Sequence, residues 1–197
     1  MQVSLGIPTN RGFQPKTFQC LLEMVAHNKD IDWHFIVSSE GYTTAENRNY
    51  IAVQACNNKS DYLLMIDDDM TFPPDTLDTL LSDKKDIVGV AYHSREREGE
   101  IMSIVETNKN EYINLEKETD PKYKKTFECY ATGTGIILIK TDVFKKVPQP
   151  WFEFTYYENG KCKEGEDWNF CFKAKDAGYK IYCDPTLKIT HIGEIVI

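Results

Sequence analysis

The sequence lacks any long apolar run. Its 197 residues contain no segment near the roughly 20 consecutive apolar residues that a membrane-spanning helix requires. The N-terminal stretch also lacks the charged and then apolar order of a signal peptide. These absences predict a protein with no membrane span, and we expect it in the cytoplasm of a bacterial cell or of a virus-infected host.

Two kinds of residue cluster are missing as well. The six cysteines are scattered without a CxxC pair, so neither a zinc knuckle nor a disulfide framework is predicted, and a reducing compartment is the simpler interpretation. The formal net charge is -8, and the basic pairs at 84–85 and 124–125 are isolated. Because nucleic-acid phosphates are bound by clustered lysine and arginine, we expect no nucleic-acid partner.

Short apolar segments that read as buried strands are spread along the chain, with helical patterns between them. They cover residues 3–7, 33–39, 61–66, 86–91 and 136–139, followed by an edge strand at 151–154 and strands ending at 184 and 193. A helix is expected from Glu166 to Gly178, where the glycine ends it. Strand and helix alternate in the first half, which predicts an α/β fold with a parallel sheet and helices on its faces.

The strand at 61–66 runs directly into three aspartates, Asp67, Asp68 and Asp69. Like charges side by side repel, so this cluster needs a cation, hydrogen bonds or open water. Ligands of open α/β sheets bind beyond the carboxyl ends of the strands, where these residues stand. Alternate residues of an extended segment point the same way, so Asp67 and Asp69 would together hold Mg2+ or Mn2+ while Asp68 points elsewhere. A solvated acidic turn is the alternative.

Three blocks of the sequence, taken in order, resemble the GT-A fold glycosyltransferases, and the family-2-like enzymes in particular. They are "DYLLMIDDDMTFPPDTL" at 61–77, "ATGTGIILIKTDVFKKV" at 131–147 and "GEDWNFCFKAKDAGYKIYCDPTLKITHIG" at 165–193. The resemblance covers nearly the whole chain. It implies a GT-A (nucleotide-diphospho-sugar transferase) fold, whose Rossmann-like, mostly parallel central sheet is flanked by helices, and a metal-dependent glycosyltransferase of the hexosyltransferase type.

The same resemblance implies a reaction and a division of the chain. A sugar would move from a nucleoside diphosphate, expected to be UDP, to a hydroxyl group of a glycan or other acceptor, with inversion. Residues 1–94 would bind the nucleotide sugar, residues 128–197 would bind the acceptor and carry the catalysis, and residues 95–127 would form a loop or hairpin. All three belong to one expected domain over residues 1–197, either a complete enzyme or one domain of a longer polypeptide.

Donor-binding roles follow from the resemblance residue by residue. Asp69 would bind Mn2+ or Mg2+ directly, and Asp67 would assist the metal or bind the ribose. His191 would complete the metal shell, against the alternative of a structural histidine. Arg48 would hold the diphosphate, against the alternative of a solvent-facing arginine. The full donor-binding set is Pro8, Thr9, Arg11, Ser39, Arg48, Asp67, Asp68 and Arg95. Family members commonly read uracil with an aspartate pair after the second strand; this chain has Ser38-Ser39-Glu40 there, which leaves the base open.

Catalytic and acceptor roles are implied in the second half. Glu166 and Asp167 match the family's "ED" motif, and Asp167 is assigned as the base that takes the proton from the acceptor hydroxyl, with Glu166 as its substitute. Acids in the first turn of a helix also stabilise its dipole without any catalytic role. The acceptor-binding set is Gly133, Thr134, Gly135 and Trp151: the glycines permit close approach, and the indole would stack on a sugar ring or belong to the core.

Two other functions stay open. The spacing of Asp67, Asp69 and Thr71 matches the opening motif of haloacid-dehalogenase-like phosphatases, in which the first aspartate is a nucleophile and the second an acid or base. That motif normally sits on the first strand, whereas two strand-helix units precede it here. The chain would alternatively be a non-catalytic sugar-nucleotide-binding domain, which binds nucleotide with metal and does not turn it over.

Overall fold

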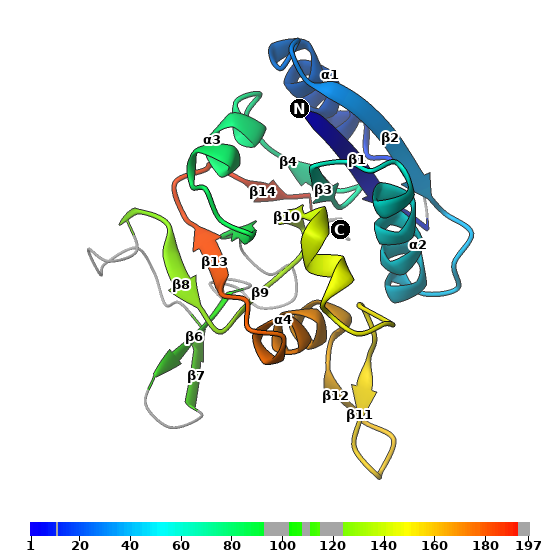
Figure 1. Ribbon diagram of the computed structural model, residues 1–197, viewed down its shortest axis with the longest axis vertical. Helices are drawn as coiled ribbons and strands as arrows, with labels where there is room; N and C mark the ends of the chain where they lie inside the picture. The colour runs from blue at the N-terminus through cyan, green and yellow to red at the C-terminus, as the bar shows by residue number, and fades with distance from the viewer. Residues whose placement is uncertain (11, 93–102, 108–110, 115–123, 193–197) are drawn as a thin grey trace, which may run out of the picture.

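A computed structural model describes residues 1–10, 12–92, 103–107, 111–114 and 124–192. Its centre is a seven-stranded sheet with the order β2-β1-β3-β10-β5-β13-β8 (Figure 1). The strands are β1 (Gln2–Pro8), β2 (Asp32–Ser38), β3 (Tyr62–Ile66), β5 (Ile87–Val90), β8 (Phe127–Cys129), β10 (Ile136–Lys140) and β13 (Ile181–Asp184). The sheet therefore combines strands from both halves of the chain.

Five of the seven strands run in one direction. The pairs β2–β1, β1–β3 and β5–β13 are parallel, whereas β10 is antiparallel to both of its neighbours and β8 is antiparallel to β13. The predicted α/β class with a mostly parallel sheet is confirmed. The parallel run of the first half is interrupted, however, because β10 lies between β3 and β5. The backbone N–H of Asp67 donates to the carbonyl of Gly135 at 2.9 Å, so the chain enters β10 from the edge where β3 ends.

Helices cover both faces of the sheet. One face carries α1 (Pro15–His27) and α3 (Thr76–Ser82), and the other carries α2 (Thr44–Asn57) and α4 (Glu166–Asp176). A capping box forms at the start of α2, between Thr43 and Glu46. Among the described residues, no helix combines the length and the apolar character needed to cross a bilayer.

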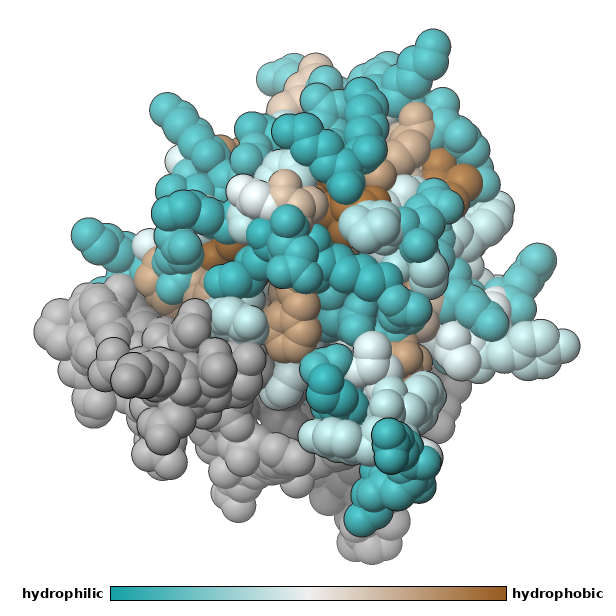
Figure 2. Space-filling view, turned by 60° about the horizontal axis from the view of Figure 1, so that its bottom comes forward, coloured by the Kyte–Doolittle hydropathy of each residue, from teal (hydrophilic) through white to brown (hydrophobic). Residues whose placement is uncertain are grey.

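Several short elements surround this sheet. A two-stranded ladder joins β4 (Met70–Thr71) to β14 (Thr190–His191), and a hairpin of β11 (Thr155–Tyr156) and β12 (Cys162–Glu164) projects from the body in Figure 1. A further sheet contains β6 (Ser103–Thr107), β7 (Glu111–Asn114) and β9 (Ala131–Thr132), and a 3-10 helix covers Thr141–Lys145. The face shown in Figure 2 is mostly hydrophilic.

The edge strand predicted at 151–154 is not formed. The segment is irregular, and β11 begins only at Thr155. Trp151 and Phe152 are both buried among aromatic side chains of the core, where Phe152 stacks on Phe170 at 4.7 Å between ring centroids. Burial of these rings, rather than ladder pairing, therefore fixes this stretch of chain.

Candidate active site

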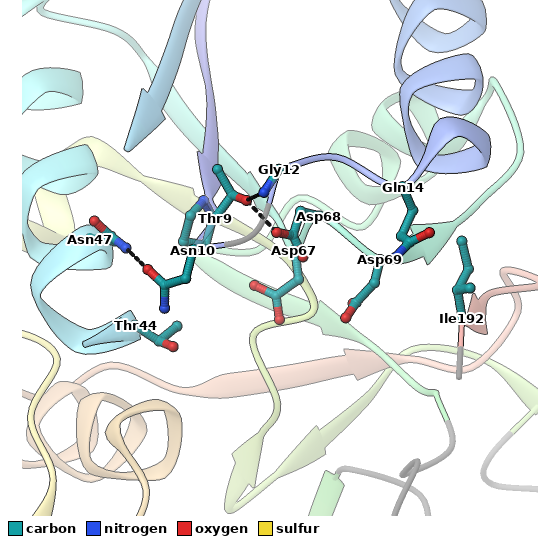
Figure 3. Close-up of a pocket in the computed structure, with 11 residues that line it drawn as sticks. Thr9, Asn10, Gly12, Gln14, Thr44, Asn47, Asp67, Asp68, Asp69 and Ile192 are labelled. Atoms are coloured by element: carbon teal, nitrogen blue, oxygen red, sulfur yellow. Dashed lines mark hydrogen bonds between the residues drawn. The ribbon is translucent and has the colours of Figure 1, made fainter. Parts of the chain in front are cut away.

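A cavity of about 350 Å3 opens at the carboxyl edge of β1 and β3 (Figure 3). It is lined by Pro8, Thr9, Asn10, Gly12, Gln14, Thr44, Asn47, Asp67, Asp68, Asp69 and Ile192. The lining comes from the loops that follow the two strands, from the start of α2 and from the end of β14. The fold therefore places the three aspartates in a concave site at the edge where parallel α/β sheets bind ligands.

Asp67 is held by Arg48. The Nη2 of Arg48 donates to both carboxylate oxygens of Asp67, at 2.7 and 3.0 Å, while its Nη1 donates to Glu166. Burial lowers the pKa of the Arg48 guanidinium, but the two carboxylates outweigh burial and raise it above its usual value. Burial raises the pKa of Asp67, and the contact with Arg48 opposes that rise. Arg48 thus links the end of β3 to the first turn of α4.

The guanidinium of Arg48 is turned toward carboxylates and not into the cavity. Its side chain is only 5% exposed, so the diphosphate contact predicted from the sequence is not supported by this geometry. The solvent-facing alternative is not supported either. A buried arginine between two acids fixes the relative position of the elements that carry them, because removing it would leave the buried Glu166 and the partly buried Asp67 without a partner.

Asp68 connects β3 to the loop that follows β1. It accepts a hydrogen bond from the hydroxyl of Thr9, which itself accepts one from the backbone N–H of Gly12 at 2.9 Å. The carbonyl of Asp68 accepts another from the N–H of Gln14 at 3.0 Å. In Figure 3 the Asp68 carboxylate points to Thr9, whereas the carboxylates of Asp67 and Asp69 point together to the other side. Asp68 therefore shapes the cavity wall.

Asp69 lies beside His191. The pairing of β14 with β4 sets His191 opposite Met70, and the N–H of Ile192 donates to the carbonyl of Asp69 at 2.8 Å. As a result the imidazole Nε2 of His191 is 3.0 Å from Oδ1 of Asp69, with both side chains largely buried. The ring of Tyr92 packs edge-on against the imidazole at 5.7 Å. Two residues that are 122 positions apart in the sequence are thus brought together.

The donor atoms at this point suit a divalent cation. A carboxylate oxygen and an imidazole nitrogen are ligands that Mn2+ accepts. No group of three or more histidine, cysteine, aspartate or glutamate side chains within the described residues is arranged to hold a metal. Ions of this class, however, commonly bind through one or two carboxylates and take further ligands from waters and substrate phosphates. Asp69 and His191 therefore fit a cation whose remaining ligands come from waters or from a phosphate.

Asp167 and Glu166 differ in their surroundings although they are adjacent in the first turn of α4. Glu166 is buried and pairs with Arg48. Burial raises the pKa of Asp167 to about 6, and the neighbouring Glu166 carboxylate raises it as well; Arg48 and the N–H of Trp168, which donates to Oδ1 at 2.8 Å, act in the opposite direction. A carboxylate with a pKa near neutrality is suited to general-base chemistry. Of the two carboxylates, Asp167 has the raised pKa, whereas Glu166 is engaged by Arg48.

The predicted acceptor residues 133–135 lie beneath the site. All three are buried, and the N–H of Gly135 donates to the hydroxyl of Tyr92 at 3.0 Å. A side chain at Gly135 would meet the Tyr92 ring at 2.7 Å, so glycine is required there by packing. Thr134 is 1% exposed. Through Gly135, this turn is hydrogen-bonded both to Asp67 at the end of β3 and to Tyr92.

The remaining predicted residues lie elsewhere. Trp151 is 4% exposed and packs against Phe144, with its indole N–H donating to the carbonyl of Val147 at 3.0 Å. The acceptor contact predicted for it is therefore not supported, and its core alternative is. Ser39 is exposed after β2, and Pro8 and Thr9 line the cavity as described. Arg11 and Arg95 lie outside the described residues.

Sequence reasoning missed Asn47. It is 1% exposed, its Oδ1 accepts hydrogen bonds from the Ser38 hydroxyl at 2.8 Å and the Gly41 N–H at 2.9 Å, and its Nδ2 donates to Asn10 at 2.9 Å. It thereby ties the ends of β1 and β2 to α2. The available signal was an asparagine inside a helix, where this residue is a poor helix former.

No protein-family model and no curated protein sequence matches this chain. Solved structures do share its fold. GalNAc-T7 with UDP, GalNAc and Mn2+ aligns with a TM-score of 0.68 at 9% identity, over 99% of this chain and 44% of that one. A197 from STIV aligns with a TM-score of 0.64 at 18% identity, over 98% and 87% of the two chains. The inositol-1-phosphate CTP transferase from T. maritima aligns with a TM-score of 0.52 at 14% identity, over 97% and 88%.

At these identities the likeness establishes the fold. The chain has the GT-A-type fold of nucleotide-diphospho-sugar transferases, as the resemblance predicted. It spans less than half the length of the GalNAc-T7 chain that it matches. Glycosyl and nucleotidyl transferases both occur among the neighbours, so the shared fold by itself selects neither reaction.

Proposed function

We propose that this protein is a metal-dependent glycosyltransferase. It moves a sugar from a nucleoside-diphosphate donor, a UDP-sugar, to a hydroxyl group of a glycan or another acceptor, with inversion at the anomeric carbon. The observation that carries the proposal is the Arg48 bridge, which sets the aspartates at the end of β3 beside the acidic first turn of α4. This arrangement supports a cation site and a general base within one active site.

The chain's own residues divide the work. The loop after β1, held by Asp68, provides the wall against which the nucleoside lies. Asp69 and His191 would hold the divalent cation, with Asp67 beside them; when bound, the ion would neutralise the charge that develops on the departing diphosphate. Asp167 accepts the proton of the acceptor hydroxyl as that oxygen attacks the anomeric carbon, and its pKa of about 6 leaves it ionised at neutral pH.

Binding calorimetry tests the donor half of the proposal. UDP, GDP and CDP are titrated into the protein with and without Mn2+, and we expect UDP to bind only with the metal. Asp69→Asn should abolish this metal-dependent binding, whereas Asp75→Asn, which changes an exposed aspartate ahead of α3, should leave it intact. Metal-independent binding, or normal binding by Asp69→Asn, would remove Asp69 as the metal ligand.

Identifying the product released from each candidate substrate distinguishes a glycosyltransferase from the alternative functions. A glycosyltransferase releases UDP from a UDP-sugar, and a nucleotidyltransferase, a class with the same fold, releases pyrophosphate from a nucleoside triphosphate. A non-catalytic domain binds UDP with metal and releases neither. Hydrolysis of phosphate monoesters would indicate the haloacid-dehalogenase-like alternative, to which the GT-A-type fold gives no support.

A further inference from the structure

An apolar surface lies beside the β2 end of the central sheet, outside the cavity described above. Phe18 and Leu22 of α1 and Phe35 and Val37 of β2 are each between 51 and 61% exposed. Scattered apolar side chains on a surface are ordinary, but a contiguous group is characteristic of an interaction site. We call these four residues the α1–β2 surface.

The four side chains share one face of the sheet. In the register of β1 with β2, Phe35 is paired with Leu5 and Val37 with Ile7. Paired residues of neighbouring strands project to the same side, and Leu5 and Ile7 are buried beneath α1. Phe35 and Val37 therefore also project to the α1 side, one strand farther out, where the helix no longer covers them.

The orientation of α1 places its exposed apolar residues next to that strand. His27 approaches Asp78 of α3 at 3.2 Å, so the His27 flank of α1 faces the interior of the sheet. Phe18 lies on the opposite flank of α1, on the β2 side, and Leu22, one helical turn farther along, lies between that flank and the outward side of the helix. Trp33, stacked on Phe35 at 6.3 Å between ring centroids, extends the same apolar strip along β2.

β2 also has a backbone edge that pairs with no other described strand. It ends the order of the seven-stranded sheet and pairs only with β1 among the described strands. Its seven residues contain no lysine and no proline, and their register with β1 runs without a bulge. Natural edge strands usually carry a lysine, a proline or a bulge, which prevents pairing with another chain. The opposite end of the sheet is closed by β8, which has only three residues.

We propose that the α1–β2 surface is the interface of a homodimer, in which β2 pairs antiparallel with β2 of a second copy. The partner must offer both a free strand edge and an apolar face, and a second copy supplies both through an isologous contact. A twofold axis through the middle of β2 sets Phe35 opposite Phe35 and Asp32 opposite Ser38. Each like-charged Asp32 is thereby kept away from its counterpart, although both chains carry a net charge of -8.

The available area suits a dimer of moderate affinity. A fully exposed aromatic side chain offers about 150–250 Å2, so the half-exposed Phe18 and Phe35 contribute roughly 200 Å2 from each copy, and Leu22 and Val37 add smaller areas. The two strand edges add to this, against about 1,200–2,000 Å2 of total buried surface in standard interfaces. Antiparallel pairing also makes the carboxyl edges of the two sheets, and hence the two cavities, face opposite ends of the dimer.

Sedimentation velocity of the full chain, from low-micromolar to hundreds of micromolar concentration, tests the proposal. The wild-type chain and Tyr156→Lys should dimerise, and Phe35→Lys should remain monomeric with an unchanged circular dichroism spectrum. Tyr156 is the matched control because it is a β-strand aromatic with the same 61% exposure, on the distant β11–β12 hairpin. A wild-type chain that stays monomeric throughout, or a Phe35→Lys chain that dimerises like Tyr156→Lys, would overturn the proposal.

A cross-linking experiment tests the register and does not depend on the lysine variant. In a Cys162→Ser background, which removes the exposed native thiol, Phe35→Cys should form a disulfide-linked dimer with glutathione disulfide as oxidant. Directly opposed strand positions lie within disulfide range. Tyr156→Cys in the same background should stay unlinked. Equal cross-linking at both positions, or none at position 35, would exclude this pairing.

Discussion

Replacing Asp167 by asparagine should stabilise the free protein at neutral pH while it removes catalysis. Burial raises the pKa of this carboxyl from 3.8 to about 6, which means that the folded state holds the charged form less well than the unfolded chain does. Asparagine keeps the shape and the acceptor for the N–H of Trp168 but never carries charge. The variant therefore loses a destabilising ionisation.

The magnitude follows from the shift. A change of about two pKa units corresponds to about 3 kcal/mol, and partial exposure of the side chain lowers the expected gain to about 1–2 kcal/mol. Below pH 3.8 the carboxyl is protonated in both states and contributes nothing. Between the two pKa values the folded state retains the proton that the unfolded state has lost, so the penalty grows as pH rises and is complete above about pH 6.

Urea unfolding of wild-type and Asp167→Asn proteins, at pH values below 4 and above 7, measures this difference. We expect similar midpoints at the acidic end and a higher midpoint for the variant at the neutral end. Asp30→Asn, which changes an exposed aspartate, is the control and should show no such trend. Turnover by Asp167→Asn should fall by roughly 10²–10⁴-fold, and wild-type kcat/KM should rise with pH through about 6. A variant that is equally destabilised at both pH values would refute the reasoning.

Three further predictions concern the surroundings of the site. Arg48→Met should lower the free energy of unfolding by about 3–5 kcal/mol in urea titrations, because the buried Glu166 and the partly buried Asp67 lose their partner; a loss below about 1 kcal/mol would contradict a buried bridge. His191→Ala should weaken UDP binding with Mn2+ roughly tenfold or more in calorimetry, and an unchanged affinity would remove it from the metal shell. Gly135→Ala should cost about 1–3 kcal/mol in the same unfolding assay because its methyl group meets Tyr92; a neutral effect would show that the ring moves aside.

The strands and the position of the aspartates could be predicted from local patterns. An apolar run that ends in acids identifies a strand and its carboxyl end, and neither depends on distant contacts. The antiparallel insertion of β10 between β3 and β5 could not be predicted in the same way. Strand order is set by which apolar faces meet in space, and the turn at 133–135 that turns β10 back is recognised only from its contacts with Asp67 and Tyr92.

The sequence could not predict which residues the charged side chains of the site contact. Arg48 is a polar residue on a helix of mixed composition, so the sequence suggested a donor contact or solvent. Its two carboxylates are 19 and 118 positions away, and no local pattern reveals such distances. For Trp151 the sequence could not distinguish two roles. An aromatic side chain after a proline can stack on a sugar ring or pack in the core, and only its burial in the structure decides for the core.

The charge of the site gives an independent reason to expect a metal. Within the described part of the chain, five carboxylates meet around the bridge and the cavity: Asp67, Asp68, Asp69, Glu166 and Asp167. One guanidinium, that of Arg48, is shared between two of them. A diphosphate would bring further negative charge into this partly buried region, where charges of the same sign repel strongly. Donor binding without a cation should therefore be unfavourable, and the affinity for UDP should depend on Mn2+ far more steeply than the affinity for uridine, which carries no phosphate.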